Sequence, residues 1–349
     1  MSSRANYGPV NSAAPRGDVM SPGKKAGLSE DDLIARFFGP LATNPGALGL
    51  SDDAAFLKPP AGHDLVLTTD ALVEGIHFFA DDAPDTLARK AMRVNLSDLA
   101  SKGARPLGFL LSLALTDKAD APWLETFVRG LKLDIDAFAC PLFGGDTVKS
   151  PGPLMINVAM FGVVPEGTMV RRAGAKPGDK VMVTGTIGDA ALGLFVRQDR
   201  LPSLSAAHRE HLVSRYLLPQ PRNALADAIR TYASASMDVS DGLIGDLAKL
   251  CAVSGVAADI DTAKIPLSGA AGAAVKQDAK LLETVVTGGD DYEIVCAVHS
   301  DKAAGLKDAA AKSGIALTEI GTVGPGVGLR VRDGSGKELK FTRRSFSHF

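Results

Sequence analysis

The 349-residue chain has few cysteines, no long apolar run and almost no surplus of charge. Its three cysteines, Cys140, Cys251 and Cys296, lie far apart in apolar segments, so they form neither a disulfide framework nor a zinc spacing, and we expect buried thiols. A net charge of −2 argues against a nucleic-acid binder or a polybasic membrane binder. Without a bilayer-length apolar stretch or the apolar core of a signal peptide, we expect no membrane partner and a reducing cytoplasm.

The common motifs for nucleotide binding and nucleophilic catalysis are also missing. The sequence holds no G-x-x-x-x-G-K-[ST] loop and no G-x-G-x-x-G between a strand and a helix. The glycine-rich stretch 184–193 has neither spacing, and we interpret it as the turn before a helix, with phosphate contact as the alternative. No Ser-His-Asp or Cys-His set stands out, so nothing indicates a covalent intermediate.

Composition indicates an extension followed by two α/β units. Residues 1–27, rich in Ser, Pro, Gly and Ala without a period, predict a disordered extension. With 46% apolar residues the rest is globular, and its length favours two domains. A stretch dense in Pro and Gly begins near Pro165, so we predict an N-terminal domain over 28–165 and a C-terminal α/β domain over 166–349.

Strand-like and helical segments interleave in both halves. Three apolar runs in the first half do not alternate with polar residues, so we expect both faces of these strands to be covered, by helices or by a partner subunit. Another pair of strands is expected at Val285–Val286 and Ile294–Cys296, around the adjacent acids Asp290 and Asp291. The predicted strands are 64–70, 106–116, 153–164, 180–185 and 235–239, and the predicted helices are 29–38, 86–103, 123–139, 189–198, 210–218 and 240–255.

Acidic residues recur along the chain, most of them at strand ends, beside Gly, Ser or Thr and without a neighbouring Lys or Arg. Strand ends are where α/β folds place ligands. Hard oxygen ligands of this kind suit Mg²⁺, which binds a few carboxylates plus substrate phosphates. The acids are Asp52, Asp53, Asp70, Asp98, Asp146, Asp238, Asp241, Asp290 and Asp291. Together they predict a multi-magnesium, phosphate-handling site.

Structural alternatives stay open for single acids. Ser240 and Asp241 precede a helix, so the pair has a capping role as its alternative. Asp146 in "GGDT" has a turn role as its alternative. Asp98 shares a helical face with Asn95, where a buried hydrogen bond would satisfy it.

His77 and the pair Arg171 and Arg172 also have interpretations without a functional role. His77 lies between apolar residues, and on that basis alone it is a core or surface residue. Arg171 and Arg172 form a pair near the predicted domain junction, where surface solvation competes with a clamp for an anion.

The acid motifs, in their order, resemble those of thiamine-monophosphate kinases, in the superfamily of ATP-binding proteins named for aminoimidazole ribonucleotide synthetase. The resemblance spans about residues 28–349. It is carried by "SDDAAFL", "TTDALVEGIHF", "KAMRVNLSDLASKGARP", "LFGGDT", "VRRAGAKPGDKVMVTGTIGDAALGL", "LLPQPR", "MDVSDGLIGDL", "TGGDDYEI" and the terminal "FSHF".

This resemblance implies an enzyme that phosphorylates thiamine monophosphate with ATP and several Mg²⁺ ions, giving thiamine diphosphate. It implies an α/β (α+β) fold of two domains, whose N-terminal strands join a second subunit's in a shared barrel of a homodimer. The attacking phosphate oxygen is already ionised, so direct in-line transfer needs no general base and no catalytic side chain is assigned. The alternatives are another ATP-dependent synthetase of the superfamily and a nucleotide-binding regulator without turnover.

The resemblance also assigns roles residue by residue. In two places the chain departs from the family's usual pattern: Ser51 replaces a glycine, which predicts strain if that position needs a positive φ, and Asp290 replaces a glutamate. The magnesium positions are Asp52, Thr68, Thr69, Asp70, Asp98, Asp146, Asp238 and Asp241; the ATP contacts are Gly145, Asp146, Arg172 and Ser240; the thiamine phosphate contacts are His77, Asp290 and Phe346.

Overall fold

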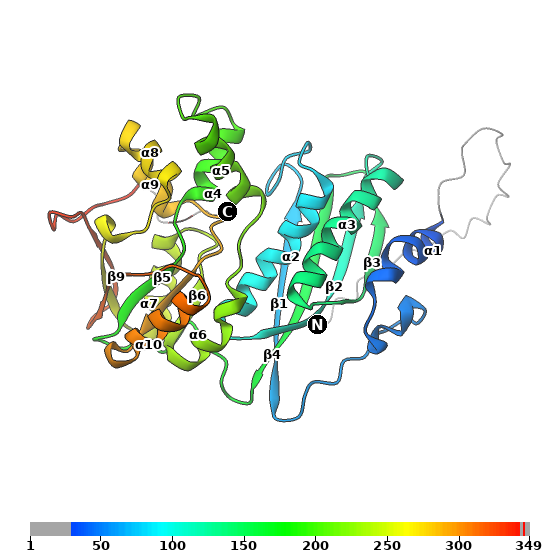
Figure 1. Cartoon of the computed structure of the whole chain (residues 1–349), viewed down its shortest axis with the longest axis horizontal. Coiled ribbons are helices and arrows are strands. Elements are labelled where there is room, and N and C mark those ends of the chain that lie inside the picture. Colours follow the sequence, from blue (N-terminus) through cyan, green and yellow to red (C-terminus); the bar gives the residue numbers. More distant parts are fainter. Residues whose placement is uncertain (1–28, 343–344, 346–349) are drawn as a thin grey trace, which may run out of the picture.

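The computed structural model describes residues 29–342 and Ser345. The chain forms two α/β halves that lie side by side (Figure 1). The first contains a four-stranded sheet in the order β1-β4-β2-β3, and the second a six-stranded sheet in the order β10-β7-β9-β5-β8-β6. The predicted extension over 1–27 and the predicted contact Phe346 lie outside the described residues.

The first sheet consists of β1 (His63–Val73), β2 (Arg105–Leu115), β3 (Leu142–Lys149) and β4 (Met155–Pro165). Strand β4 runs antiparallel to β1 and β2, whereas β2 and β3 are parallel. Helices α2 (Pro84–Ser101) and α3 (Ala121–Phe138) cover one face of this sheet (Figure 1). Their side chains and the inward residues of the strands form one buried core. The predicted strands and helices of this half are confirmed, and β3 was not predicted.

The other face of the first sheet stays open in the single chain. Along β1, buried residues alternate with exposed ones, and Leu65 and Leu67 on the open face are 42% and 68% exposed. The prediction that helices cover both faces is therefore wrong. Cover by a partner subunit stays a prediction.

The segment before β1 is short and irregular. Helix α1 (Glu30–Leu33) continues into a wider turn over Ile34–Phe38, and two 3₁₀ turns follow at Gly39–Leu41 and Pro45–Leu50. The predicted N-cap of the first helix is confirmed, because the Ser29 hydroxyl accepts the amide hydrogen of Asp32 at 3.2 Å.

The second sheet is mixed, with β7 and β10 parallel and its other pairs antiparallel. Its strands are β5 (Lys180–Thr184), β6 (Ala233–Asp238), β7 (Ala257–Asp261), β8 (Ile294–Val298), β9 (Leu317–Gly324) and β10 (Gly328–Arg332). Its helices are α4 (Asp189–Arg197), α5 (Ala206–Leu217), α6 (Ala226–Tyr232), α7 (Leu243–Ser254), α8 (Gly269–Gln277), α9 (Leu281–Thr287) and α10 (Ser300–Lys312).

One predicted strand of the second half is wrong. Val285 and Val286 are fully buried, as expected, but they belong to helix α9. A short apolar run fits a buried helix as well as a buried strand, and periodicity cannot separate the two. The companion prediction at Ile294–Cys296 is confirmed by β8, whose five residues are all buried.

The two halves share a small core of their own. Ala100 near the end of α2 packs with Leu225 and Ile229 of the second half and with Ile294 of β8. The first sheet ends at Pro165 and the second begins at Lys180, so the predicted boundary falls in the connection between the sheets. No helix in the described part of the chain is long and apolar enough to cross a membrane.

Candidate active site

Strand β1 and helix α2 bring the first carboxylates together. Side chains alternate along a strand, so Thr68 and Asp70 face α2 while Thr69 faces the open side. The Thr68 hydroxyl donates a hydrogen bond to the Asp98 carboxylate on α2. The Thr69 hydroxyl instead lies 3.2 Å from the side chain of Asn157 on β4. Thr68, Asp70 and Asp98 therefore face the same side of the strand, and Thr69 faces the other side.

The second half adds two more carboxylates at the same junction. Asp238 ends β6 and is 3% exposed, and Asp241 follows in the loop before α7. Burial, then the charge of Asp98, raise the pKa of Asp238 well above its usual range. Burial, then Asp98, then Asp241, raise the pKa of Asp70 to about 7. Asp98 and Asp241 thus oppose the charged form of Asp70, and Asp98 opposes that of Asp238. We call these four acids, two from each half, the junction acids.

The junction acids have the chemistry of a cation site. A bound cation offsets mutual repulsion between carboxylates, and hard oxygen ligands of this kind suit Mg²⁺, which also takes water and phosphate oxygens. In the described residues, no group of three or more acidic, His or Cys side chains is arranged to hold a metal ion by itself.

A separate acid holds the loop that carries Ser240 and Asp241. Asp246, in the first turn of α7, accepts the amide hydrogens of Ser240 at 3.0 Å and Asp241 at 2.9 Å. The capping role for the Ser240–Asp241 pair is therefore wrong, because the helix begins at Leu243 and its own first turn satisfies the loop. Lys249 pairs with both acids, at 2.5 Å from Asp241 and 2.9 Å from Asp246.

Gly242 completes this loop, and no other residue would fit there. Its φ is +112°, and a Cβ atom would lie 2.6 Å from the backbone of Thr287.

His77 and Asp290 lie at one cavity although they come from different halves. The cavity measures about 650 Å³ and is lined by both residues together with Asp70, Ser240 and Asp241. The ring nitrogen Nδ1 of His77 accepts the amide hydrogen of Val73 at 3.0 Å. The prediction from the residues alone, of a plain core or surface histidine, is therefore superseded: His77 is part of a cavity wall.

The adjacent acid Asp291 has a different task from Asp290. It is 3% exposed and accepts the amide hydrogen of Gly188 at 2.8 Å, at the start of α4. Burial, above all, raises the pKa of Asp291 well above its usual range. The amides of the glycine-rich stretch 184–193 thus hold a carboxylate where the alternative had placed a phosphate. Two acids can stand side by side here because Asp290 faces the cavity and Asp291 faces the protein interior.

Glu293 anchors the segment that carries Asp290 and Asp291. It is fully buried and accepts hydrogen bonds from Arg215 at 2.8 Å, from Arg222 at 2.6 Å and from Thr184 at 2.7 Å. A buried charge with this many partners anchors the segment that carries Asp290.

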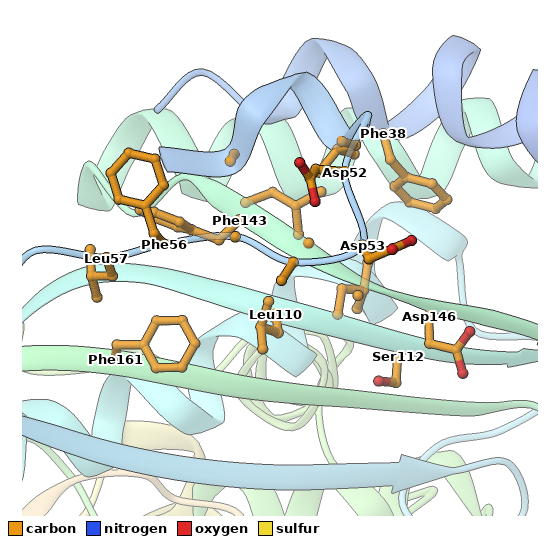
Figure 2. A pocket seen from close by; sticks show the side chains of 18 of the residues that line it. Phe38, Asp52, Asp53, Phe56, Leu57, Leu110, Ser112, Phe143, Asp146 and Phe161 are labelled. Atoms are coloured by element: carbon orange, nitrogen blue, oxygen red, sulfur yellow. The ribbon is translucent and has the colours of Figure 1, made fainter. Parts of the chain in front are cut away.

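A second cavity, of about 800 Å³, lies on the open face of the first sheet, and Asp52, Gly145 and Asp146 line it. Figure 2 shows Asp52 and Asp53 on the loop above the strands and Asp146 beside Ser112 on neighbouring strands. Asp146 lies inside β3, so its turn alternative is wrong. The structure thus separates Asp52 and Asp146 from the junction acids, and both sets border on the first sheet.

The residue before Asp146 has to be a glycine because strands β2 and β3 come very close at position 145. A Cβ atom at position 145 would lie 1.8 Å from the carbonyl oxygen of Leu111, so only glycine allows β3 to pair with β2 here. The strain predicted at Ser51 is absent, because its φ is −105°. Positive φ values fall instead on Leu48, Gly49 and Leu50.

Arg172, which the resemblance assigns to ATP, lies near Lys102, and the charges of the two residues interact. Arg172 is exposed, and its carbonyl oxygen accepts a hydrogen bond from Ser254 at 3.2 Å. Burial lowers the pKa of Lys102 to about 8, an effect that Asp238 opposes and Arg172 reinforces. The Lys102 ammonium donates to the carbonyl oxygen of Ser236 at 2.8 Å. The Lys102 ammonium is thus close enough to Arg172, Asp98 and Asp238 for their charges to interact.

Three residues of the site escaped the sequence analysis: Lys90, Tyr216 and Tyr292. Lys90 bonds the side chain of Asp290, Tyr216 and Tyr292 line the cavity, and the Tyr292 backbone has a φ of +51°. Burial, then Asp290, raise the pKa of the Tyr292 phenol, so it stays protonated beside the acids. A left-handed aromatic residue beside a ligand cavity is where strain of functional origin is expected.

Comparison with known proteins gives consistent results. The family models for the N-terminal and C-terminal domains of AIR synthase related proteins match residues 51–164 and 176–334. The chain is 44% identical to the thiamine-monophosphate kinase of Caulobacter vibrioides, with 86% of each chain covered.

Two solved structures extend the likeness to three dimensions. The crystal structure of thiamine-monophosphate kinase from Stenotrophomonas maltophilia K279a has a TM-score of 0.80 and 37% identity, covering 89% of this chain and 98% of that one. AaThiL complexed with AMPPCP and TMP has a TM-score of 0.73 and 31% identity, covering 95% of this chain and 100% of that one.

Proposed function

The chain belongs to the thiamine-monophosphate kinases, within the AIR synthase related family, and we propose that it passes the γ-phosphoryl group of ATP directly to the phosphate of thiamine monophosphate. The predicted resemblance, the two-domain α+β fold and the kinase activity are confirmed by these relatives. A relative complexed with AMPPCP and TMP supports ATP and thiamine monophosphate as the two substrates. One observation carries the proposal: two of the junction acids, Asp70 and Asp241, line the same cavity as His77 and Asp290.

Magnesium ions belong to the proposal because both substrates are anionic. When bound, Mg²⁺ offsets phosphate charge and helps to align the attacking and leaving oxygens. The four junction acids, with Thr68, are the residues that would hold it. Asp52, Thr69 and Asp146 complete the proposed set by resemblance, and they line or face the open side of the first sheet.

The chain's own residues bind and orient the two substrates. His77 and Asp290 would contact thiamine monophosphate in the 650 Å³ cavity, whose wall also includes apolar side chains such as Ile76 and Leu194. Those side chains exclude water from the acceptor. The acceptor phosphate is ionised at neutral pH, so no residue has to take a proton. Phe346, outside the described residues, remains a proposed ring contact.

The residues proposed to contact ATP come from both cavities and from the surface. Gly145 and Asp146 lie in the wall of the open-face cavity, Ser240 in the wall of the acceptor cavity, and Arg172 is exposed. Arg172 would pair with phosphate oxygens through its guanidinium fork.

We further propose a homodimer that closes the open face. Exposed Leu65 and Leu67 make this face apolar, and strands of a second subunit would cover it as a shared barrel. The proposed domains span 28–165 and 166–349. We propose no nucleic-acid partner, no membrane partner and a cytoplasmic location. The cytoplasmic location rests on Cys140, Cys251 and Cys296, which are free thiols in buried positions.

Product analysis tests this function. Purified protein with Mg²⁺ and ATP should form thiamine diphosphate and ADP in equal amounts when thiamine monophosphate is supplied. ADP release at the same rate with unphosphorylated thiamine, or with no acceptor, would overturn the assignment. No ADP release with thiamine monophosphate would instead favour the synthetase and regulator alternatives.

A further inference from the structure

Lys90 is a buried cation directly behind the acceptor cavity. It lies on α2, and its side chain is 2% exposed. Its ammonium nitrogen is 3.1 Å from a carboxylate oxygen of Asp290 and 3.2 Å from the carbonyl oxygen of His77. The same nitrogen lies 4.0 Å from the centre of the Tyr216 ring, a cation–π contact. Three residues of the cavity wall thus meet on one lysine.

These contacts join the two halves at the substrate site. Lys90 and His77 belong to the first half, whereas Asp290 and Tyr216 belong to the second. The Tyr216 hydroxyl also donates to the His77 carbonyl, at 3.3 Å. Asp290 needs such support because its φ is +73°, a conformation that side chains other than glycine rarely adopt. Its amide hydrogen is held by the Ser240 carbonyl at 2.8 Å.

The ion pair also changes the charge of the cavity wall. Asp82 lies near Lys90 as well, but it pairs with Arg197 at 2.9 Å, so Asp290 is the acid to which Lys90 is bound. The cavity wall also holds the acids Asp70, Asp241 and Glu283 and the cations Arg200 and Lys280. An acceptor that carries a phosphate enters such a wall more easily when one of its carboxylates is neutralised from behind.

We propose that Lys90 is a positioning residue that makes the acceptor cavity select the phosphorylated form of a cationic substrate. It holds Asp290 and His77 in place, and its charge cancels that of Asp290. Thiamine monophosphate is the substrate in question, so the inference rests on the proposed function. Without Lys90, the lone Asp290 carboxylate would repel the phosphate of that substrate while attracting its cationic ring.

Unphosphorylated thiamine makes this selectivity measurable. It carries the same cationic ring and lacks only the phosphate, so the ratio of the two dissociation constants isolates the effect on the phosphate. A unit charge at the edge of a buried cavity changes binding of an anionic group by roughly tenfold. We therefore define selectivity as Kd for thiamine divided by Kd for thiamine monophosphate.

The experiment is titration calorimetry of the whole protein and its variants with each compound. Lys90→Met should lower the selectivity by about tenfold or more, and Asp290→Asn, which leaves Lys90 uncompensated, should raise it. The double variant, with both charges removed, should return to within about threefold of the unchanged protein. Lys90→Arg keeps the charge and should keep the selectivity.

Arg230→Met is the matched structural control. Arg230 also bonds across the two halves, to the Gly103 carbonyl at 2.7 Å, but it does not line the acceptor cavity. Its loss should lower the melting temperature and leave the selectivity unchanged.

The outcomes distinguish a structural role of Lys90 from the proposed role in selectivity, and failure of either from failure of the proposed function. If Lys90→Met weakens both compounds by the same factor, Lys90 has only a structural role and the inference is overturned. Should that variant not fold, unchanged selectivity in Asp290→Asn overturns the inference equally well. If the unchanged protein binds neither compound, the proposed function fails and the inference fails with it; if it binds thiamine monophosphate and only the variants disagree, the function stands.

Discussion

The Thr68 hydroxyl on β1 donates a hydrogen bond to the Asp98 carboxylate on α2. This bond ties a strand of the first sheet to the helix that packs against the second half. Asp98 is also the carboxylate with the largest charge effect on both Asp70 and Asp238. One residue therefore connects the acids of the two halves, and the arrangement depends on where α2 lies between the sheets.

Asp70 predicts how stability depends on pH when no divalent ion is present. Its pKa is raised in the folded protein, to about 7 from 3.8, so the folded state binds the proton more tightly than the unfolded state. The free energy of unfolding should thus fall as pH rises from about 4 to about 7, by about 1–3 kcal/mol. Asp70→Asn should flatten this dependence. Urea unfolding in EDTA at pH 5 and pH 7.5 measures it.

Asp136→Asn is the control for Asp70→Asn. Asp136 is a surface acid that pairs with Lys132 at 2.9 Å, so this variant should keep the pH dependence of the free energy of unfolding. Added Mg²⁺ should stabilise the unchanged protein more at pH 7.5 than at pH 5, because protons compete for the same carboxylates. An unchanged slope in Asp70→Asn would contradict the burial and repulsion described at the junction.

Glu293→Gln should destabilise the fold by about 1–3 kcal/mol, because it leaves two half-buried guanidinium groups without their charge partner. Both Arg215 and Arg222 bond this carboxylate. The loss should appear as a lower urea midpoint, with and without Mg²⁺. Asp259→Asn is the comparison, since Asp259 also pairs with two arginines, Arg330 and Arg332, but at the surface. Equal effects of the two changes would show that Glu293 anchors nothing.

Leu67→Glu should abolish the proposed homodimer. Leu67 is 68% exposed in the single chain, so a charge there costs the monomer little, whereas it would lie in the shared barrel of a dimer. Light scattering at micromolar concentration should report a dimer for the unchanged protein and a monomer for the variant. Val327→Glu, at a position 83% exposed in the second half, should remain dimeric. A folded, active monomer of the unchanged protein would refute the shared barrel.

Direct transfer predicts inversion of configuration at the transferred phosphorus. No side chain is assigned as a nucleophile, and the thiols of Cys140 and Cys296 are buried, with pKa values that burial raises to about 12. ATP made chiral at the γ-phosphorus, followed by stereochemical analysis of thiamine diphosphate, gives the answer. Retention would require a phosphorylated enzyme intermediate and would contradict the in-line step.

Local pattern predicted the elements around the site well and their surroundings less well. The strands 64–70 and 106–116 and the helix 86–103 carry strong apolar signals of sufficient length, and all three are present. The strand that holds Asp146 has two glycines and few apolar residues, so its sequence reads as a turn. What makes it a strand is pairing with β2, a contact that local sequence does not contain.

The site was predictable as a set of residues and not as an arrangement. Thr69 and Asp70 are adjacent in sequence and point to opposite faces, which only the strand register decides. Lys90 escaped notice because its partner Asp290 lies 200 residues away and because α2 is buried around most of its circumference. No period in the sequence distinguishes such a lysine from one at the surface.

Asp98→Asn tests the central claim, that the junction acids form a magnesium-dependent site for phosphoryl transfer, most directly. The measurement is a pair of thermal melts, with and without Mg²⁺ and ATP, combined with thiamine diphosphate formation. Removing one of several mutually repelling charges should leave the melting temperature without ligand unchanged or slightly higher. The ligand-induced rise in melting temperature should shrink, and turnover should fall by about two orders of magnitude or more. A variant that melts much lower without ligand, yet keeps its ligand-induced rise and its activity, would contradict the account.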